Sequence, residues 1–378
     1  MAFEHYIRSG QKWLRCGYTT GTCAALAAAG AARLLLTGEA AAHMSLKTPK
    51  GLTVDVPLTE LKLTGDTASC AVIKDGGDDA DVTDGYPIAV SVRRLPSGLV
   101  IDGGEGVGRV TKPGLDQPVG AAAINRVPRE MIRAAAEREM EAAGYTGGLS
   151  VTVSVPDGAK LAAHTFNPVL GVEGGISILG TSGIVEPMSD QAIVDTIALE
   201  ARQARASGAA HMILTPGNYG MDFLTANGLN VPGVPCVKYS NFVGEALDIA
   251  VSEGFTSVLL VGHIGKLVKV AGGVMNTHSK YADCRLELLC AHAALCGGSR
   301  ELCQGLMTAA TTDAAIPMLD GEGLRQPVMD SLMTAIQRYL ERRVRGGCRV
   351  GALMFSNEYG LLGRTHTVEE LMQLWQTS

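Results

Sequence analysis

The chain has 378 residues, of which 46% are hydrophobic and 19% are charged, so it is long enough for two domains and apolar enough to bury a core in each. Its formal net charge of −6 supplies no global basic field for nucleic acid or an anionic membrane, and 4% aromatic residues are too few for a base-stacking surface. An acidic ligand would therefore need a local basic pocket.

Nine cysteines are present, and none forms a C-x-x-C pair. Their odd number and the lack of an apolar signal segment predict reduced thiols in a cytoplasmic protein. Cys284, Cys290, Cys296 and Cys303 recur every six or seven residues. That spacing favours one packed helix face, with a metal cluster as the alternative, and we assign no metal site.

The first part of the chain predicts an α+β domain over residues 1–170. Helices are expected at 22–36, which is too short to span a bilayer of about 20 residues, and at 128–143. Between and after them lie short strand candidates bounded by Gly, Pro and Asp: 44–48, 52–58, 69–75, 88–95, 99–104 and 148–156. We expect a mostly antiparallel sheet.

Residues 171–378 predict a second, Rossmann-like α/β domain with a mainly parallel sheet. Continuous apolar strands are expected at 175–180, 209–215, 256–262 and 348–356. Helices are expected at 191–206 and 242–254, and 280–345 reads as helical with a looser middle at 320–327. Buried strands alternating with helices indicate a sheet covered on both faces.

Each of these strands is followed by a glycine-rich loop: GTSGIVE, TPGNYG, GHIGKLVK and SNEYGLLG. In open α/β sheets, ligands bind outside the carboxyl ends of the strands. The alternative is that the glycines serve turn geometry alone. The candidate ligand-binding residues are Gly180, Thr181, Ser182, Gly183, Glu186, Gly217, Asn218 and Gly262.

These loops offer hydroxyls, an amide and a carboxylate, but no phosphate fingerprint of the G-x-G-x-x-G or G-x-x-x-x-G-K-[ST] kind. A carboxylate suits ribose hydroxyls, an amine or a sulfonium. S-adenosylmethionine carries all three groups and no phosphate. For Glu186 the alternative is a helix N-terminal acid stabilised by the helix dipole.

The candidate catalytic residues are His263 and Glu186. His263 follows a strand and could serve as a base, although a hydrogen-bonded scaffold histidine is the alternative. Lys266 and Lys269 could pair with substrate carboxylates, or they could lie on a solvated face.

Two loops of the first part also draw attention. VIKDGGDDADVTDG (72–85) carries five aspartates but no bidentate Glu at the twelfth position, so we interpret it as a turn-rich binding loop and not a calcium site. GGEGVGRVTKPGL (103–115) lacks G-K-[ST], so it is no P-loop. Arg109 and Lys112 make this second loop locally basic.

Several unusual motifs together resemble the cobalt-precorrin-5B C(1)-methyltransferase family of anaerobic cobalamin biosynthesis. The match runs in order from about residue 12 to 283 and more loosely beyond, with Cys16 and Ser182 as small departures. The motifs are RCGYTTGTCAA, VIKDGGDDADVTDG, GGEGVGRVTKPGL, AAINRVPREMI, TFNPVLGVEGGISILGTSGIVEPMS, TPGNYG, SNFVGEAL and VGHIGKLVKVAGGVMNTHSKYAD.

The resemblance implies methyl transfer from S-adenosylmethionine, as co-substrate, to C-1 of cobalt-precorrin-5B, giving cobalt-precorrin-6A, with cobalt present only within the substrate. It implies no nucleic-acid or membrane partner. It leaves open a homodimer and transient contacts with neighbouring pathway enzymes. An NAD(P)-dependent tetrapyrrole reductase and a non-catalytic tetrapyrrole carrier are the alternatives.

The carboxylate arms of such a substrate require cationic and polar groups. The candidate substrate-binding residues are Arg15, Thr19, Thr20, Lys74, Asp75, Arg109, Lys112, Lys266 and Lys269.

Overall fold

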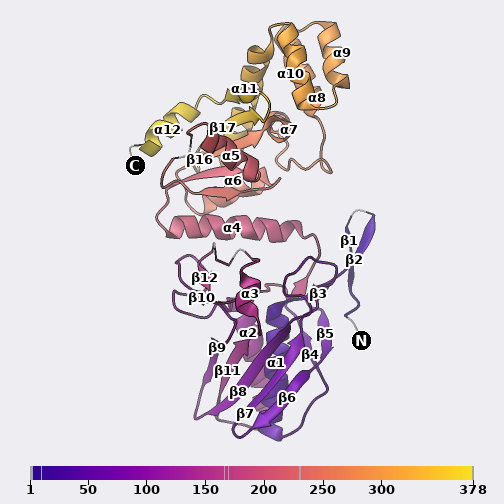
Figure 1. Ribbon diagram of the computed structural model, residues 1–378, viewed down its shortest axis with the longest axis vertical. Helices are drawn as coiled ribbons and strands as arrows, with labels where there is room; N and C mark the ends of the chain where they lie inside the picture. Colours follow the sequence, from indigo (N-terminus) through magenta and orange to yellow (C-terminus); the bar gives the residue numbers. More distant parts are fainter. Residues whose placement is uncertain (1–2, 10, 166, 169, 230, 377–378) are drawn as a thin grey trace. The chain divides into compact units, whose positions relative to one another are not determined.

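The computed structural model describes residues 3–9, 11–165, 167–168, 170–229 and 231–376. The protein is a mixed α/β molecule with several sheets (Figure 1). It divides into two compact units, Met1–Ser189 and Asp190–Ser378.

The first unit is built on a five-stranded sheet of order β6-β7-β8-β11-β9, in which all pairs are antiparallel except β9 with β11. The six strands predicted for residues 1–170 by alternation and turn residues all form, whereas β1, β2, β3, β6, β10, β12 and β13 were not anticipated. The elements are β1 (Tyr6–Ser9), β2 (Lys12–Arg15), β3 (Gly17–Tyr18), α1 (Thr20–Thr37), β4 (His43–Lys47), β5 (Thr53–Pro57), β6 (Thr59–Thr64), β7 (Thr67–Ile73), β8 (Pro87–Leu95), β9 (Leu99–Gly103), β10 (Arg109–Val110), α2 (Arg126–Ala142), β11 (Gly148–Ser154), α3 (Gly158–Ala162), β12 (Val172–Glu173) and β13 (Ile184–Val185).

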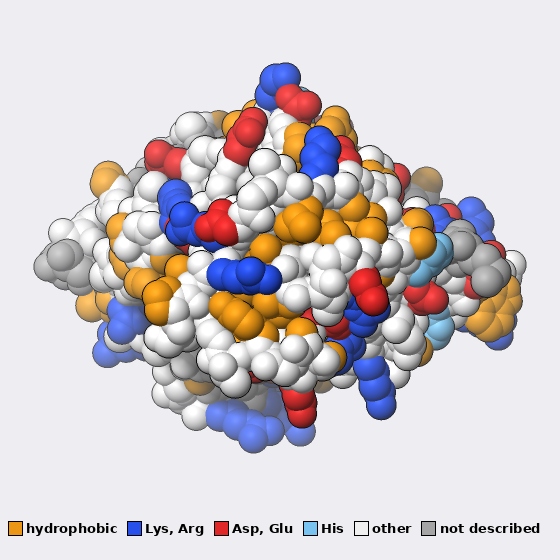
Figure 2. Space-filling model, turned by 90° about the horizontal axis from the view of Figure 1, so that it is seen from below, with side chains coloured by type: hydrophobic (Ala, Val, Ile, Leu, Met, Phe, Trp, Pro, Cys, Tyr) orange, Lys and Arg blue, Asp and Glu red, His pale blue; other side chains and the backbone are white. Residues whose placement is uncertain are grey.

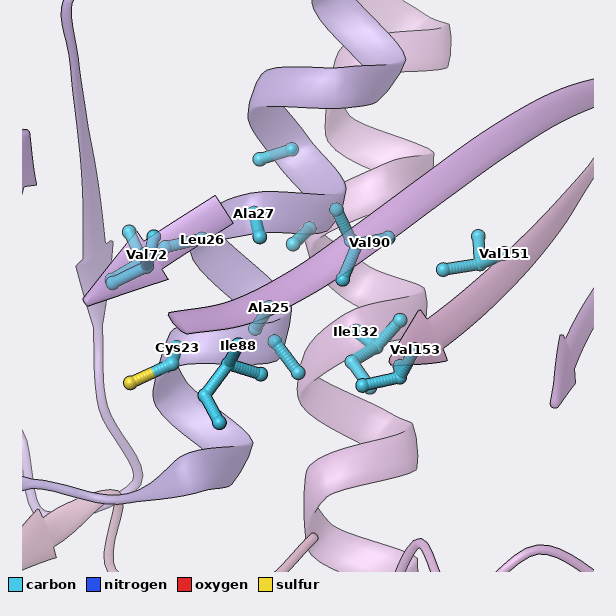
Figure 3. Close-up of a cluster of buried hydrophobic side chains, with 14 of the residues drawn as sticks. Cys23, Ala25, Leu26, Ala27, Val72, Ile88, Val90, Ile132, Val151 and Val153 are labelled. Atoms are coloured by element: carbon cyan, nitrogen blue, oxygen red, sulfur yellow. The ribbon is translucent and has the colours of Figure 1, made fainter. Parts of the chain in front are cut away.

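The core of this unit lies between the sheet and two helices, α1 and α2. Figure 3 shows Cys23, Leu26 and Ala27 of α1 packed near Val72 of β7 and Ile88 of β8. Alanine-rich α1 starts after Thr19, whose side chain accepts a hydrogen bond from the Thr22 N–H, and stops at Gly38 in the left-handed region. By length and composition α1 could cross a membrane, but 83% of it is buried in this core.

One expected strand is wrong. Residues 175–180 do not form the first strand of the parallel sheet. They make only isolated bridges, from Ile176 to Val107 and from Ile178 to Ile124. The short strand that follows, β13, pairs antiparallel with β3. The apolar run indicated burial correctly, but burial alone does not select a sheet partner.

The second unit is built on the sheet β15-β14-β16-β17-β18, in which only β18 is antiparallel to its neighbour. The helices and apolar strands expected here are confirmed, including the helical region and its break between α10 and α11. The elements are α4 (Asp190–Ala206), β14 (His211–Thr215), α5 (Asn218–Ala226), β15 (Cys236–Lys238), α6 (Val243–Ser252), β16 (Ser257–His263), α7 (Ile264–Leu267), the 3-10 helix η1 (Val268–Gly272), α8 (Arg285–Leu295), α9 (Arg300–Thr308), α10 (Thr312–Gly321), α11 (Arg325–Val344), β17 (Arg349–Ser356), β18 (Gly360–Arg364) and α12 (Val368–Gln376).

Each face of this parallel sheet carries its own core. Residues from α4, α6 and α8–α11 form the larger cluster, and residues from α5 and α12 form the smaller one. Successive strand residues alternate between the two, so that Leu260 belongs to the larger cluster and Val261 to the smaller. Both faces are therefore covered, and the strand ends remain available for loops that carry polar groups.

On the face shown in Figure 2, positive and negative side chains are interspersed around a central group of hydrophobic side chains. Neither sign dominates that face. Among the described residues no group of three or more His, Cys, Asp or Glu side chains could hold a metal ion, and all nine cysteines are free thiols.

Candidate functional site

The parallel sheet has a topological switch point between β14 and β16. From β14 the chain passes to β15 on one side and then crosses back to β16 on the other. The loops that leave two adjacent strands at such a point diverge and open a crevice at their carboxyl ends, where ligands of open α/β sheets bind. We call the carboxyl ends of β14, β16 and β17 the rim. Three of the four predicted glycine-rich loops leave the sheet there: TPGNYG, GHIGKLVK and SNEYGLLG.

At the β14 side of the rim, Gly217 precedes α5. A Cβ placed on Gly217 would meet no heavy atom within 4 Å, so the space beside its backbone is open. No side chain caps the start of α5, and Asn218 at its first position is exposed. Free N–H groups at a helix start favour an electron-rich ligand group.

At the β16 side, Gly262 lies against a buried tyrosine. A Cβ on Gly262 would lie 3.3 Å from the Tyr239 hydroxyl. That hydroxyl is buried and has no hydrogen-bond partner among the described residues. Burial raises the pKa of Tyr239, so the phenol stays protonated and neutral. A hydrogen-bonding group is thus held unused close to the rim.

His263, the last residue of β16, is oriented by two neighbours. Its Nδ1 accepts the Gly265 N–H at 3.1 Å, and its Nε2 lies 3.7 Å from Oδ1 of Asp313. The neutral ring therefore carries its proton on Nε2. Neither nitrogen then offers a free lone pair, and this argues against the base role expected from the sequence.

Asp313 and Ser356 were missed by sequence reasoning. Asp313 lies in the first turn of α10, and its Oδ1 accepts a hydrogen bond from the Ser356 hydroxyl at the end of β17. Ser356 Oγ in turn accepts the N–H groups of Glu358 and Tyr359 at 3.1 and 3.2 Å. An acid in the first turn of a helix is common, so the sequence held no signal that this one lies beside His263.

The two rim lysines serve the chain itself. Lys266 Nζ donates to the carbonyl of Ser240 at 3.3 Å, and burial lowers the pKa of Lys266. Lys269 is only 2% exposed and donates to the carbonyls of Thr277 and Ala282 at 3.1 and 2.9 Å. Lys269 therefore holds the loop that follows η1, and its charge is not presented to a substrate.

The GTSGIVE loop belongs to the first unit and covers the start of α1, so the structure does not bring its residues into the parallel sheet. Gly180 and Gly183 have φ values of +132° and +79°, and a Cβ on Gly180 would lie 2.2 Å from Thr19 Oγ1. Thr181 is exposed, and Ser182 Oγ donates to the Ile184 carbonyl at 2.9 Å.

Glu186 forms an ion pair with the Lys50 side chain. The backbone N–H of Lys50 donates to the Ser182 carbonyl at 3.0 Å. Because the expected strand 175–180 is absent from the parallel sheet, this loop does not leave that sheet together with the loops of Gly217, Asn218 and Gly262. Its predicted role in donor binding stays a prediction.

Thr19 and Thr20 have structural partners. Thr19 caps α1, and Thr20 Oγ1 accepts the Leu179 N–H at 2.9 Å. Gly21 N–H donates to the Leu179 carbonyl at 2.9 Å. The Gly21 and Thr22 N–H groups at the start of α1 are therefore satisfied within the unit.

The cations predicted to hold substrate carboxylates mostly pair with acids of their own unit. Arg15 makes two hydrogen bonds to Asp75, at 2.6 and 2.8 Å, and the guanidinium helps to hold the pKa of that carboxyl below its usual value against the opposing effect of burial. Lys74 is 2% exposed and lies 2.8 Å from Asp81. The aspartate-rich loop therefore directs its carboxylates to groups of its own unit.

Arg109 and Lys112 are more open. Arg109 donates to Asp102 at 2.7 and 3.0 Å, yet its side chain is 44% exposed, and its hydrogen bond to the Asp102 carboxylate raises the pKa of this guanidinium. Lys112 is exposed. Among the predicted substrate-binding cations, these two remain accessible to an external carboxylate.

The mainly parallel sheet, covered on both faces, defines a mixed α/β protein of the open-sheet class, in which ligands commonly bind at the strand ends. The chain belongs to the CbiD family: the CbiD model matches residues 7–187 and the CbiD C-terminal domain model matches residues 276–366.

Relatives extend over almost the whole chain. The cobalt-precorrin-5B C(1)-methyltransferase of Ruminiclostridium cellulolyticum is 45% identical over 94% of this chain and 92% of its own. The proteins of the same name from Alkaliphilus metalliredigens and Moorella thermoacetica are each 41% identical, over 98% and 96% of this chain and 97% and 98% of their own. A crystal structure of the cobalamin biosynthesis protein CbiD from Archaeoglobus fulgidus is 27% identical and covers 73% of this chain and 86% of its own, with a TM-score of 0.39.

Proposed function

We propose that this chain is a cobalt-precorrin-5B C(1)-methyltransferase. It transfers a methyl group from S-adenosylmethionine to C-1 of cobalt-precorrin-5B and yields cobalt-precorrin-6A. The observation that carries the proposal is the match, at 41–45% identity over nearly the full length, to three bacterial proteins that bear this name.

The second unit acts as a Rossmann-like domain that binds the methyl donor at the rim. Three features support this role: the switch point between β14 and β16, the open backbone at Gly217 and Asn218, and the unused Tyr239 hydroxyl behind Gly262. The absence of a phosphate fingerprint in the sequence agrees with a donor that has no phosphate.

The first unit contributes positive charge for the substrate's carboxylate arms. Arg109 and Lys112 are the accessible candidates, and a substrate carboxylate would compete with Asp102 for the Arg109 guanidinium. This local charge reconciles an acidic chain with an acidic substrate. Cobalt enters with the substrate and needs no site of its own.

In the reaction the sulfur–methyl bond breaks and its electron pair stays on sulfur, giving S-adenosylhomocysteine. The new carbon–methyl bond uses an electron pair of the macrocycle, whose acceptor carbon is enamine-like and already nucleophilic. The main contribution of the protein is alignment of carbon, methyl and sulfur with the reacting atoms about 3–3.5 Å apart. No strong base is required.

The test is a single-turnover reaction of the purified protein with cobalt-precorrin-5B and methyl-labelled S-adenosylmethionine. We expect one labelled methyl group in the product, located at C-1, together with S-adenosylhomocysteine in equal amount. Macrocycle binding without consumption of the donor would instead indicate a carrier. Oxidation of NADPH without methyl transfer would indicate a reductase.

A further inference from the structure

His263 and Asp313 present a hydrogen-bond donor and an acceptor side by side at the rim. Nε2 of His263 and Oδ1 of Asp313 are 3.7 Å apart, which is too long for a direct hydrogen bond. Their side chains are 28% and 25% exposed, so both can be reached from outside. A small polar group could contact both at once.

The backbone decides which ring nitrogen of His263 is the hydrogen-bond donor. Because the Gly265 N–H points at Nδ1 from 3.1 Å, the neutral ring keeps its hydrogen on Nε2, the nitrogen that faces Asp313. The ring is also fixed edge-on against Phe355, with centroids 5.7 Å apart, and Phe355 stacks on Phe223 of α5 at 4.4 Å. His263 therefore offers a hydrogen in a defined direction.

The acceptor is held equally firmly. Ser356 donates to Oδ1 of Asp313, and the Ser356 hydroxyl is fixed by two backbone N–H groups of the turn after β17. Thr312 Oγ1 lies 3.3 Å from Oδ2. These contacts leave lone pairs of the carboxylate free for a ligand.

This arrangement discriminates among the groups of an adenosyl donor. An ammonium or sulfonium group needs acceptors only and would be opposed by the Nε2–H. A carboxylate needs donors only and would be repelled by Asp313. A hydroxyl donates one hydrogen bond and accepts another through a single oxygen, so it satisfies both partners at once, whereas the adenine edge would need two separate atoms, one to donate and one to accept.

We infer that Asp313 and His263 form the ribose-hydroxyl subsite of the methyl donor, with Asp313 accepting from a 2′- or 3′-hydroxyl and His263 donating to it. The inference rests on the proposed function and deepens it. It gives His263 a binding role in place of the base role expected from the sequence, and it adds Asp313 to the site.

The experiment is calorimetry with three probes, S-adenosylhomocysteine and its 2′-deoxy and 3′-deoxy analogues, on the full chain and on Asp313→Asn. We expect Asp313→Asn to bind S-adenosylhomocysteine about 10- to 100-fold more weakly, since a hydrogen bond to a charged group is lost. One deoxy analogue should bind the native protein about 10-fold more weakly or worse. On Asp313→Asn the same analogue should lose little more, because the contact is already gone.

Two controls keep folding apart from binding. Asp320→Asn removes an exposed carboxylate from the same helix and should leave affinity unchanged. His263→Asn keeps an oxygen near the Gly265 N–H but removes the Nε2 donor, so it should bind S-adenosylhomocysteine more weakly. This variant tests the subsite even where Asp313→Asn does not fold.

Native affinity in Asp313→Asn, or a deoxy penalty that persists in full in that variant, would overturn the subsite while leaving the proposed function intact. A native protein that binds no S-adenosylhomocysteine would overturn both.

Discussion

Gly180 and Gly183 show that glycines in a loop can serve close packing and backbone conformation as well as ligand binding. The sequence suggested a ligand loop, whereas the structure gives each glycine a steric reason of its own. Gly183 has φ +79°, and a Cβ there would lie 2.8 Å from the Thr48 Cβ and 3.0 Å from Thr22 Oγ1. Its carbonyl accepts from Thr22 Oγ1 at 2.7 Å, so the loop is bound closely to the start of α1.

The variant Gly183→Ala should therefore destabilise the first unit by more than backbone strain alone. We expect about 1 kcal/mol from the left-handed φ and about 1–3 kcal/mol more from overpacking. Gly85→Ala is the matched control, because Gly85 has φ +76° and open space where its Cβ would be. Urea denaturation compares the two, and equal losses would show that close packing of the loop contributes nothing.

Lysines show the limits of residue type as a guide. Lys74 and Lys269 were expected to contact a substrate because they lie in glycine-rich loops. Both are instead buried, Lys74 against a carboxylate and Lys269 against two carbonyls. A buried charge must be paired, and the partners lie only 7, 8 and 13 residues along the chain, so the folding of the loop and not the residue type selects them.

Among the elements, α12 closes the smaller core of the second unit. It buries Val368, Leu371 and Trp375, and the indole Nε1 donates to Ser257 Oγ at 2.6 Å. The same Ser257 oxygen lies 2.8 Å from His211 Nδ1, within hydrogen-bond distance. The His211 ring also stacks on Trp375, with centroids 5.8 Å apart.

The buried position of His211 predicts that the folded protein loses stability at acid pH. Burial lowers the pKa of His211 in the folded protein, so the unfolded chain takes up the proton first. Above about pH 6.5 both states are neutral and nothing is lost; as the pH falls below this value, stability decreases, by at most about 1.4 kcal/mol per pH unit for one proton. Urea midpoints at pH 8 and pH 5.5 measure the effect.

His211→Asn offers an acceptor that cannot titrate, so it should lose less stability between the two pH values than the native protein. His292, whose pKa burial also lowers, remains in both proteins and serves as the common background. An identical loss in the two proteins would show that His211 does not contribute.

At the scale of the whole molecule, the chain has separate cores on either side of the Ser189–Asp190 division. The first unit's main core runs from Cys16 to Ile184, and the second unit's cores draw on residues from Ile197 onward. Each unit thus has the apolar interior that independent folding requires.

We expect the fragment 190–378 to fold alone and to bind S-adenosylhomocysteine with the affinity of the full chain, because the rim residues all lie within it. The fragment 1–189 should fold without binding this ligand. Circular dichroism and calorimetry on both fragments test this. Much weaker binding by fragment 190–378 would return Gly180–Gly183 and Glu186 to the donor site.

The order of the apolar strands and helices could be predicted wherever a segment carried its own signal. The alanine-rich α1 with Thr19 and Gly38 at its ends is one case, and the buried strand β16 is another. The edge strands β6 and β18 were missed because β6 is mostly exposed and polar, and because β18, Gly-Leu-Leu-Gly-Arg, has no alternation of apolar and polar residues. The run 175–180 was misassigned because an apolar stretch pairs with whatever surface is complementary.

The sequence by itself determined the family, the reaction class, many of the longer helices and strands, and the three loops that leave the rim, because local patterns and ordered motifs need no knowledge of distant contacts. Only the tertiary structure decided that Asp313 lies beside His263, that the GTSGIVE loop covers α1, and that most of the loop cations are already paired. The first two facts depend on contacts between distant segments, such as the 161 residues that separate Thr22 from Gly183, and the third depends on how each loop folds around its own cation. No local pattern encodes such contacts, because packing and charge pairing are satisfied jointly by the whole fold.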